Sequence, residues 1–207
     1  TVVTTLNAEM QIYANKAVQK ILTDGAQRKH RVSQAALVAL APDGAVRAII
    51  GAREYEGEFS RATTSARQPG SAFKLFVYLA ALQNGWQPDD TVQDTPLTVG
   101  GKEITNSDGH FLGKISLETA LARSRNPAAV RLFQEIGGAK VIALAQQLGI
   151  STPLEDVPTL ALGVSDVRLI ELTGASNRMA LSACARMAAI SAIGARKNAN
   201  GCSPTIL

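Results

Sequence analysis

The residues of this chain best suited to chemistry are a serine at position 71 and a lysine at position 74. Pro69-Gly70 breaks the structure that precedes them, and the apolar run over residues 75–82 predicts a helix that ends near Gly85. Ser71 is therefore expected at the N-cap or in the first turn, with Lys74 on the same face one turn later. A lysine with a lowered pKa can take the proton of a serine hydroxyl, and N–H groups at a helix start can stabilise an oxyanion. The pair predicts acyl transfer through a serine ester.

A serine and a lysine at this spacing also occur as a helix cap and a solvated side chain, so the surrounding sequence decides between the two interpretations. Residues 67–74 read Arg-Gln-Pro-Gly-Ser-Ala-Phe-Lys, and this string resembles the active-site serine motif of the class A penicillin-binding proteins. Arg61-Ala62-Thr63 before it resembles the same pattern. The family carries three motifs, of which S-x-x-K is the first. The resemblance is nearly continuous up to Ala175.

Ser124-Arg125-Asn126 matches the second motif of that family, S-x-N. On their own, Ser124 and Asn126 are interpreted as a loop residue and as the cap of a helix whose first residue is Pro127. The resemblance implies that the serine hydroxyl relays a proton and that the carboxamide hydrogen-bonds both the lysine and a substrate amide. Asn106-Ser107-Asp108-Gly109 resembles a further family segment, Asn-Tyr-Asp-Gly, with serine in place of the aromatic residue.

The third motif, K-T-G or K-S-G, is absent from this sequence, and Thr173-Gly174 follows a leucine. Beyond residue 175 the composition also changes, because residues 176–207 hold no acidic residue, both cysteines and the basic residues that account for the net charge of +4. We predict a partial transpeptidase domain over residues 1–175 and an atypical basic tail over 176–207, truncated or frame-shifted after about residue 175. Four scattered charges without aromatic residues predict no nucleic-acid binding.

The elements that must position these residues follow from apolar spacing and turn residues. The 207 residues suffice for one domain with a sizeable core. Helical spacing predicts a helix over residues 8–23, and Pro42-Asp43-Gly44 between two β-leaning runs predicts a hairpin of covered strands over residues 34–51. Ser116 is expected to cap a short helix, two further helices are expected over residues 127–136 and 139–148, and Ser165 is expected to cap the helix that follows it.

The family resemblance implies an α+β fold of the penicillin-binding and serine β-lactamase type. In that fold an antiparallel sheet is flanked by helices beside an all-helical subdomain, and here the final strands would be missing. It implies that Ser71 attacks the penultimate D-alanine carbonyl of a peptidoglycan stem peptide ending in D-Ala-D-Ala, with Lys74 as base, Ser124 as relay and Asn126 as positioner. β-Lactams would acylate Ser71, and no metal or organic cofactor is implied. The site would face the periplasm or the cell exterior, with a membrane anchor and a glycosyltransferase domain expected before Thr1.

Two alternatives stay open at the level of sequence. One is a serine β-lactamase, against which stand Ser124-Arg125-Asn126 in place of Ser-Asp-Asn and the Arg-Gln-Pro-Gly sequence before Ser71. The other is a catalytically defective chain, or a module that binds stem peptide without turning it over. The missing K-T-G triplet favours this second alternative.

Overall fold

The computed structural model describes residues 1–27, 32–54 and 59–180. The chain divides into two compact units. The first takes residues 1–65 together with the chain from residue 168 onward, and the second takes residues 66–167. In the described ranges, no helix is both long enough and apolar enough to cross a membrane.

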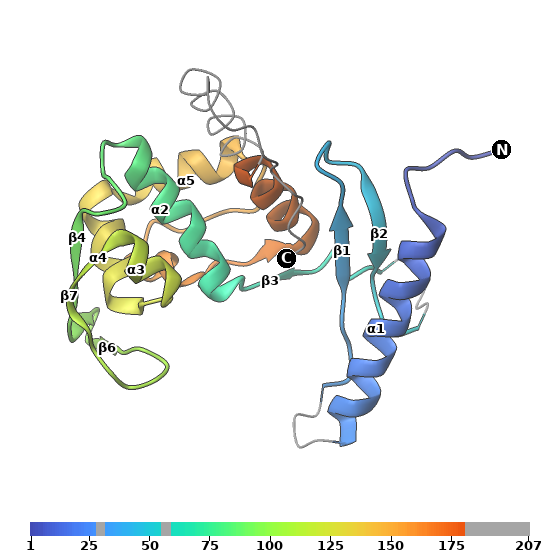
Figure 1. Cartoon of the computed structure of the whole chain (residues 1–207), viewed down its shortest axis with the longest axis horizontal. Helices are drawn as coiled ribbons and strands as arrows, with labels where there is room; N and C mark the ends of the chain where they lie inside the picture. The colour runs from blue at the N-terminus through green and yellow to red at the C-terminus, as the bar shows by residue number, and fades with distance from the viewer. Residues whose placement is uncertain (28–31, 55–58, 181–207) are drawn as a thin grey trace, which may run out of the picture. The chain divides into compact units, whose positions relative to one another are not determined.

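The first unit is built from a helix laid on a β-hairpin, coloured blue to cyan in Figure 1. Helix α1 (Ala8–Gln27) packs on β2 (Val46–Ile50), which pairs antiparallel with β1 (Leu37–Leu40). In the turn, the Asp43 carboxylate accepts a hydrogen bond from the Ala45 N–H. The predicted helix and hairpin are confirmed. The prediction that both strands are central and covered is wrong for β1. This strand pairs only with β2 within the described residues and is half-buried along its length.

The core of this unit is formed by small and branched apolar side chains from one face of α1 and from β2. Its buried members are Ala14, Val18, Leu22, Ala48 and Ile50. Residues 169–180 are helical and also belong to this unit. Asn177 in that segment donates its side-chain N–H groups to the carbonyls of Ala41 and Pro42 in the hairpin turn.

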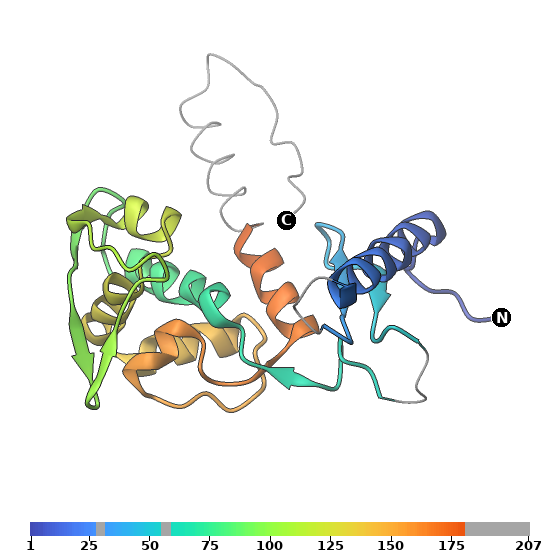
Figure 2. The ribbon, with the colours of Figure 1, turned by 90° about the horizontal axis from the view of Figure 1, so that it is seen from below.

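The second unit is mainly helical, as Figures 1 and 2 show in green to orange. It contains the short 3₁₀ helix η1 (Gly70–Phe73), which leads directly into α2 (Lys74–Gln83). Three α-helices and a second 3₁₀ helix follow: α3 (Leu117–Ala122), α4 (Asn126–Ile136), α5 (Gly138–Gln147) and η2 (Pro158–Leu162). Helix α4 contacts α2, α5 and η2, and Val130, Leu132 and Phe133 on it are buried. This helix is therefore the centre of the unit's core.

Two short antiparallel ladders belong to this unit. Strand β4 (Thr91–Asp94) pairs with β7 (Gly113–Ser116), and β5 (Leu97–Val99) pairs with β6 (Lys102–Ile104). The two-residue strands β3 (Ala66–Arg67) and β8 (Val167–Arg168) pair with each other. The β4–β7 ladder brings Asp94 opposite Gly113, which positions one end of the site described below.

Two predicted helix caps differ from the structure. Asn126 is the first residue of α4 and not its cap, and its side chain bonds elsewhere. Ser165 does not cap a helix, because β8 follows it and its hydroxyl accepts from the Glu155 N–H. The cap at Ser116 is confirmed, since its hydroxyl accepts from the Thr119 N–H.

The predicted boundary at residue 175 falls inside the helical segment 169–180. The rest of the predicted basic tail, including Cys184 and Cys202, lies outside the described residues. The division into residues 1–175 and 176–207 and the proposed frame shift therefore stay predictions.

Candidate active site

Ser71 lies in η1, one turn before Lys74, and is exposed. It is a first-turn residue, since Pro69 takes the N-cap position without a side-chain hydrogen bond. The backbone around Gly70 is held against η2, where Gly163 has a φ of 72°. A Cβ at Gly163 would overlap the backbone oxygen and nitrogen of Gly70. Glycine at position 163 thus permits the close approach that fixes the start of the serine-bearing turn.

Lys74 is the first residue of α2, and only 1% of it is exposed. Its Nζ donates to three oxygens: the Ser124 carbonyl at 2.6 Å, the Ser124 hydroxyl at 3.0 Å and the Asn126 Oδ1 at 2.6 Å. Among the described residues, it makes no hydrogen bond to the Ser71 hydroxyl. The fold therefore brings Lys74, Ser124 and Asn126 into direct contact and leaves Ser71 beside them, one helical turn away.

Burial is the main influence on the Lys74 amine. It lowers the pKa of Lys74 from 10.5 to about 8, assisted by the nearby positive charge of Arg125 and opposed by Asp94. Burial acts in this direction because the charged ammonium loses solvation. At neutral pH about a tenth of the molecules then carry a neutral amine, which has a lone pair able to accept a proton. This arrangement fits a general base.

Ser124 has an unusual backbone conformation at the loop between α3 and α4. Its φ of 52° makes it the one non-glycine residue with positive φ in the described part of the chain. An L-residue in this left-handed region costs roughly 1–2 kcal/mol. In this conformation both the carbonyl and the hydroxyl of Ser124 reach the Lys74 ammonium. Strain of this kind persists where neighbouring contacts hold it in place.

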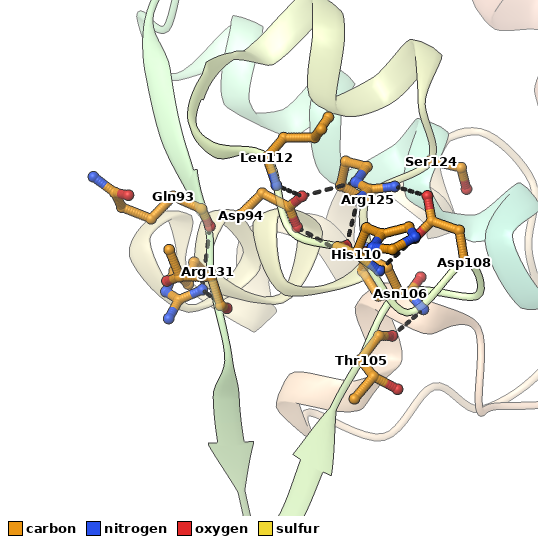
Figure 3. Close-up of polar contacts among 12 residues, drawn as sticks. Gln93, Asp94, Thr105, Asn106, Asp108, His110, Leu112, Ser124, Arg125 and Arg131 are labelled. Carbon is orange, nitrogen blue, oxygen red and sulfur yellow. Dashed lines mark hydrogen bonds and ion pairs between the residues drawn. The ribbon is translucent and has the colours of Figure 1, made fainter.

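The next residue, Arg125, lies at the centre of a cluster of polar side chains shown in Figure 3. Arg125 is 5% exposed and donates to Asp94 and to Asp108, each at 2.7 Å, and to the His110 carbonyl. Asp94 is fully buried, whereas Asp108 is 51% exposed. Removing one partner of a buried ion pair typically costs about 3–5 kcal/mol, so the Asp94–Arg125 pair fixes this region firmly.

Asn106 joins this cluster to the S-x-N turn. Its Nδ2 donates to Asp94 at 2.8 Å, and its Oδ1 accepts from the backbone N–H of Asn126 at 2.8 Å. The Asn126 carboxamide, in turn, donates to the Thr105 carbonyl at 2.8 Å. This bond fixes the amide orientation in which Oδ1 faces Lys74.

The cluster also controls the charge of its acids. Burial would raise the pKa of Asp94, but hydrogen bonds from Asn106, Arg125 and the Leu112 N–H outweigh it and keep that pKa below its ordinary value. Hydrogen bonds to Asp108 and Asp94 raise the pKa of Arg125 despite its burial. Asp94 and Arg125 therefore both stay charged at neutral pH.

Sequence reasoning identified Ser71, Lys74, Ser124 and Asn126, but it missed the roles of Asp94 and Arg125. The sequence feature that could have indicated these two residues is a single charged side chain next to residues that are apolar or form a turn. Arg125 stands directly before the buried start of α4, and Asp94 ends the alternating strand β4. In the described ranges, no three His, Cys, Asp or Glu side chains gather in a way that could hold a metal ion.

A mixed helix-and-strand fold that joins the lysine of S-x-x-K to an S-x-N turn defines the class of penicillin-interacting serine proteins. Residues 34–195 match the family described as the penicillin binding protein transpeptidase domain. The chain belongs to this family. The family predicted from the first two motifs is thereby confirmed, as is the α+β fold class.

Relatives and solved structures agree with this assignment. The chain is 36% identical over 154 residues to penicillin-binding protein 1A of Pseudomonas aeruginosa, covering 69% of this chain and 18% of that protein. It is 42% identical over 123 residues to penicillin-binding protein 1A of Neisseria flavescens, covering 55% and 15%. The PonA1 protein of Mycobacterium tuberculosis in complex with penicillin V superposes with a TM-score of 0.74 at 32% identity, covering 86% of this chain and 50% of that one. The chain thus spans about a fifth of the length of the curated relatives it matches.

Proposed function

We propose that this chain carries the serine acylation site of a D,D-transpeptidase that cross-links peptidoglycan stem peptides. The observation that carries the proposal is the buried Lys74 amine, held by Ser124 and Asn126 one turn after the exposed Ser71. The family assignment supports the substrate class, and a structural relative at 32% identity was solved with penicillin V.

In the first step, Lys74 in its neutral form takes the proton of the Ser71 hydroxyl. The serine oxygen bonds to the carbonyl carbon of the penultimate D-alanine, and the peptide C–N bond breaks. The departing amine of the terminal D-alanine takes up a proton through the Ser124 hydroxyl, which lies 3.0 Å from the Lys74 Nζ. Ser124 can relay this proton because a hydroxyl both donates and accepts.

In the second step, the amine of a neighbouring stem peptide attacks the serine ester. Its nitrogen bonds to the acyl carbon, the Ser71 oxygen leaves, and the proton that the amine loses returns to Ser71 through the same lysine. Asn126 supplies a carboxamide oriented by its bond to the Thr105 carbonyl. It would hold the lysine and a substrate amide in this geometry.

A β-lactam would acylate Ser71 by the same attack on its strained amide. The site would face the periplasm or the cell exterior, where stem peptides lie. No role in nucleic-acid binding is proposed.

A second candidate is a chain that binds or is acylated without turnover. The observation that favours it is the absence of a Lys-Thr-Gly or Lys-Ser-Gly triplet from the sequence. The family resemblance implies that the strand carrying this triplet supplies one N–H of the oxyanion hole and contacts to the substrate carboxylate. Losing a single oxyanion donor costs about 10²–10³ in rate, and losing the whole strand should cost more.

The test incubates the chain with a peptide ending in D-Ala-D-Ala and an acceptor amine, and measures both the released D-alanine and the amide formed with the acceptor. A parallel assay follows benzylpenicillin hydrolysis, and Ser71→Ala is the control in both. Release together with amide formation, both lost in the control, supports the transpeptidase. Acylation without release supports the second candidate, and rapid penicillin turnover would instead indicate a β-lactamase.

A further inference from the structure

The S-x-N turn contains one residue that family motifs leave unspecified, Arg125. Its side chain points into the cluster of Asp94, Asn106 and Asp108, as Figure 3 shows. Arg125 stands between Ser124 and Asn126, which both accept hydrogen bonds from Lys74. It is only 5% exposed and donates hydrogen bonds to Asp94, Asp108 and the His110 carbonyl. It is therefore able to set the shape of the turn.

We propose that Asp94, Asn106 and Arg125 form a positioning cluster that holds Ser124 in its left-handed conformation and thereby aims the S-x-N oxygens at Lys74. The cluster acts on the turn at two adjacent points. Arg125 anchors the residue after Ser124 through its side chain, and Asn106 anchors the next residue through the backbone N–H of Asn126.

Asp94 joins these two anchors into one unit. Its Oδ2 accepts from Arg125 at 2.7 Å and from the Leu112 N–H at 2.9 Å, while its Oδ1 accepts from Asn106 at 2.8 Å. Asp94 is itself fixed because β4 pairs with β7 and because Arg131 donates to the carbonyls on both sides of it, those of Gln93 and Thr95. A rigid strand end thus determines where both anchors lie.

The strain at Ser124 explains why such a cluster is needed. Released from its neighbours, a serine at φ 52° relaxes to a negative φ, and such a rotation moves the carbonyl or hydroxyl away from the lysine. A displacement of about 1 Å in a reacting group can cost about 10²-fold in rate. The cluster therefore acts through Ser124 and Asn126 and not by touching substrate.

Three variants separate positioning from simple stability. Arg125→Gln removes the positive charge that pairs with Asp94 and Asp108, and Asp94→Asn combined with Arg125→Gln removes the buried pair together, which leaves no unpaired buried charge. Asp108→Asn is the matched control, because it breaks one Arg125 bond of the same length at a carboxylate that is 51% exposed. Exposed pairs contribute little, so this control should acylate within about 5-fold of the native chain.

The inference rests on the proposed role of Lys74 as base, so two readouts are needed. The first is the rate constant of acylation by a fluorescent penicillin at saturation. It should fall about 10²-fold in Arg125→Gln and in the double variant, with the half-saturating concentration little changed. A rate constant of acylation within about 3-fold of the native value in the folded double variant would overturn the proposal.

The second readout is the Lys74 titration, followed by NMR of ¹³Cε-labelled lysine and assigned with Lys74→Arg. It requires no catalytic activity, so it judges the inference even if the native chain is not acylated. The charged groups that act on Lys74 are Arg125 and Asp94, and Tyr78 follows one turn later on α2. In the double variant the opposing charge effects of Arg125 and Asp94 on Lys74 are removed together, so a shifted Lys74 midpoint reports that the S-x-N oxygens around the ammonium have moved, whereas Asp108→Asn should leave the midpoint in place. An unmoved midpoint in the folded double variant would refute the inference.

Discussion

The burial of Lys74 predicts that this chain gains stability as the pH rises above neutral. The perturbation is a pH change from about 7 to about 10, applied to the native chain and to Lys74→Met, which has a similar length and no charge. In the folded chain the pKa of Lys74 is lowered from 10.5 to about 8. Between these values the unfolded chain binds more protons than the folded one, so the free energy of unfolding increases with pH.

The magnitude follows from the size of the pKa shift. One pKa unit corresponds to about 1.36 kcal/mol, so a group that is only 1% exposed contributes up to about 3 kcal/mol over the full range, of which about 2.5 kcal/mol is gained by about pH 10. Well below the folded pKa of about 8 the contribution is constant, because Lys74 is then protonated in both states. Any other group that titrates in this pH range is common to both chains and cancels in the difference.

The assay is urea denaturation of both chains at several pH values, compared as the difference in the free energy of unfolding. We expect the native chain to gain about 2.5 kcal/mol relative to Lys74→Met between about pH 7 and pH 10. A difference that stays constant over this range would show that folding does not lower the lysine pKa, and the burial argument for a neutral amine would fail.

Three further predictions concern the backbone and the core. Ser124→Gly should be more stable than Ser124→Ala by about 1 kcal/mol in thermal denaturation, because both lack the hydroxyl and only alanine keeps the strain; equal stability would contradict the left-handed φ. Gly163→Ala should slow penicillin acylation strongly and destabilise the chain, because the added Cβ would overlap the Gly70 backbone. Gly109→Ala is the control, since Gly109 has a similar φ of 70° but open space around it, so that variant carries only the strain of positive φ. Equal losses of stability in the two variants would exclude the close contact with η1. Leu22→Ala should lower the free energy of unfolding by about 2–5 kcal/mol, while Ile21→Ala, 63% exposed, should change it by less than about 0.5 kcal/mol; similar losses would contradict the packing of α1.

Much of the fold could be predicted because local signals and tertiary structure agree. Pro42-Asp43-Gly44 predicted the hairpin, and Gly137 separates two helices where the sequence indicated. The cap at Ser116 was also correct, because a serine hydroxyl bonds the free N–H groups of whichever helix follows it.

The caps at Asn126 and Ser165 were wrong for a tertiary reason. The Asn126 side chain has a stronger partner in the buried Lys74 ammonium, and Ser165 bonds to the distant Glu155 N–H. Local sequence carries no information on a partner that arrives from 52 or 10 residues away. The same limit explains why the Asp94–Arg125 pair, 31 residues apart, was missed.

The candidate site could be predicted because residues 67–74 and 124–126 resemble two motifs of one family. The resemblance pointed to Ser71 and Lys74 and implied a bond between Asn126 and the lysine, but it did not predict that both oxygens of Ser124 accept from the lysine amine. Those oxygens depend on the strained Ser124 backbone, and the strain is invisible in sequence because serine rarely adopts positive φ.

Whether Ser71 is the nucleophile can be measured directly from the intact mass of the chain after incubation with benzylpenicillin, alongside Ser71→Ala. We expect an adduct of one penicillin on the native chain and none on the variant, with the label mapped to the peptide that holds Ser71. A folded native chain without adduct, or an adduct that persists in Ser71→Ala, would contradict acylation at this serine.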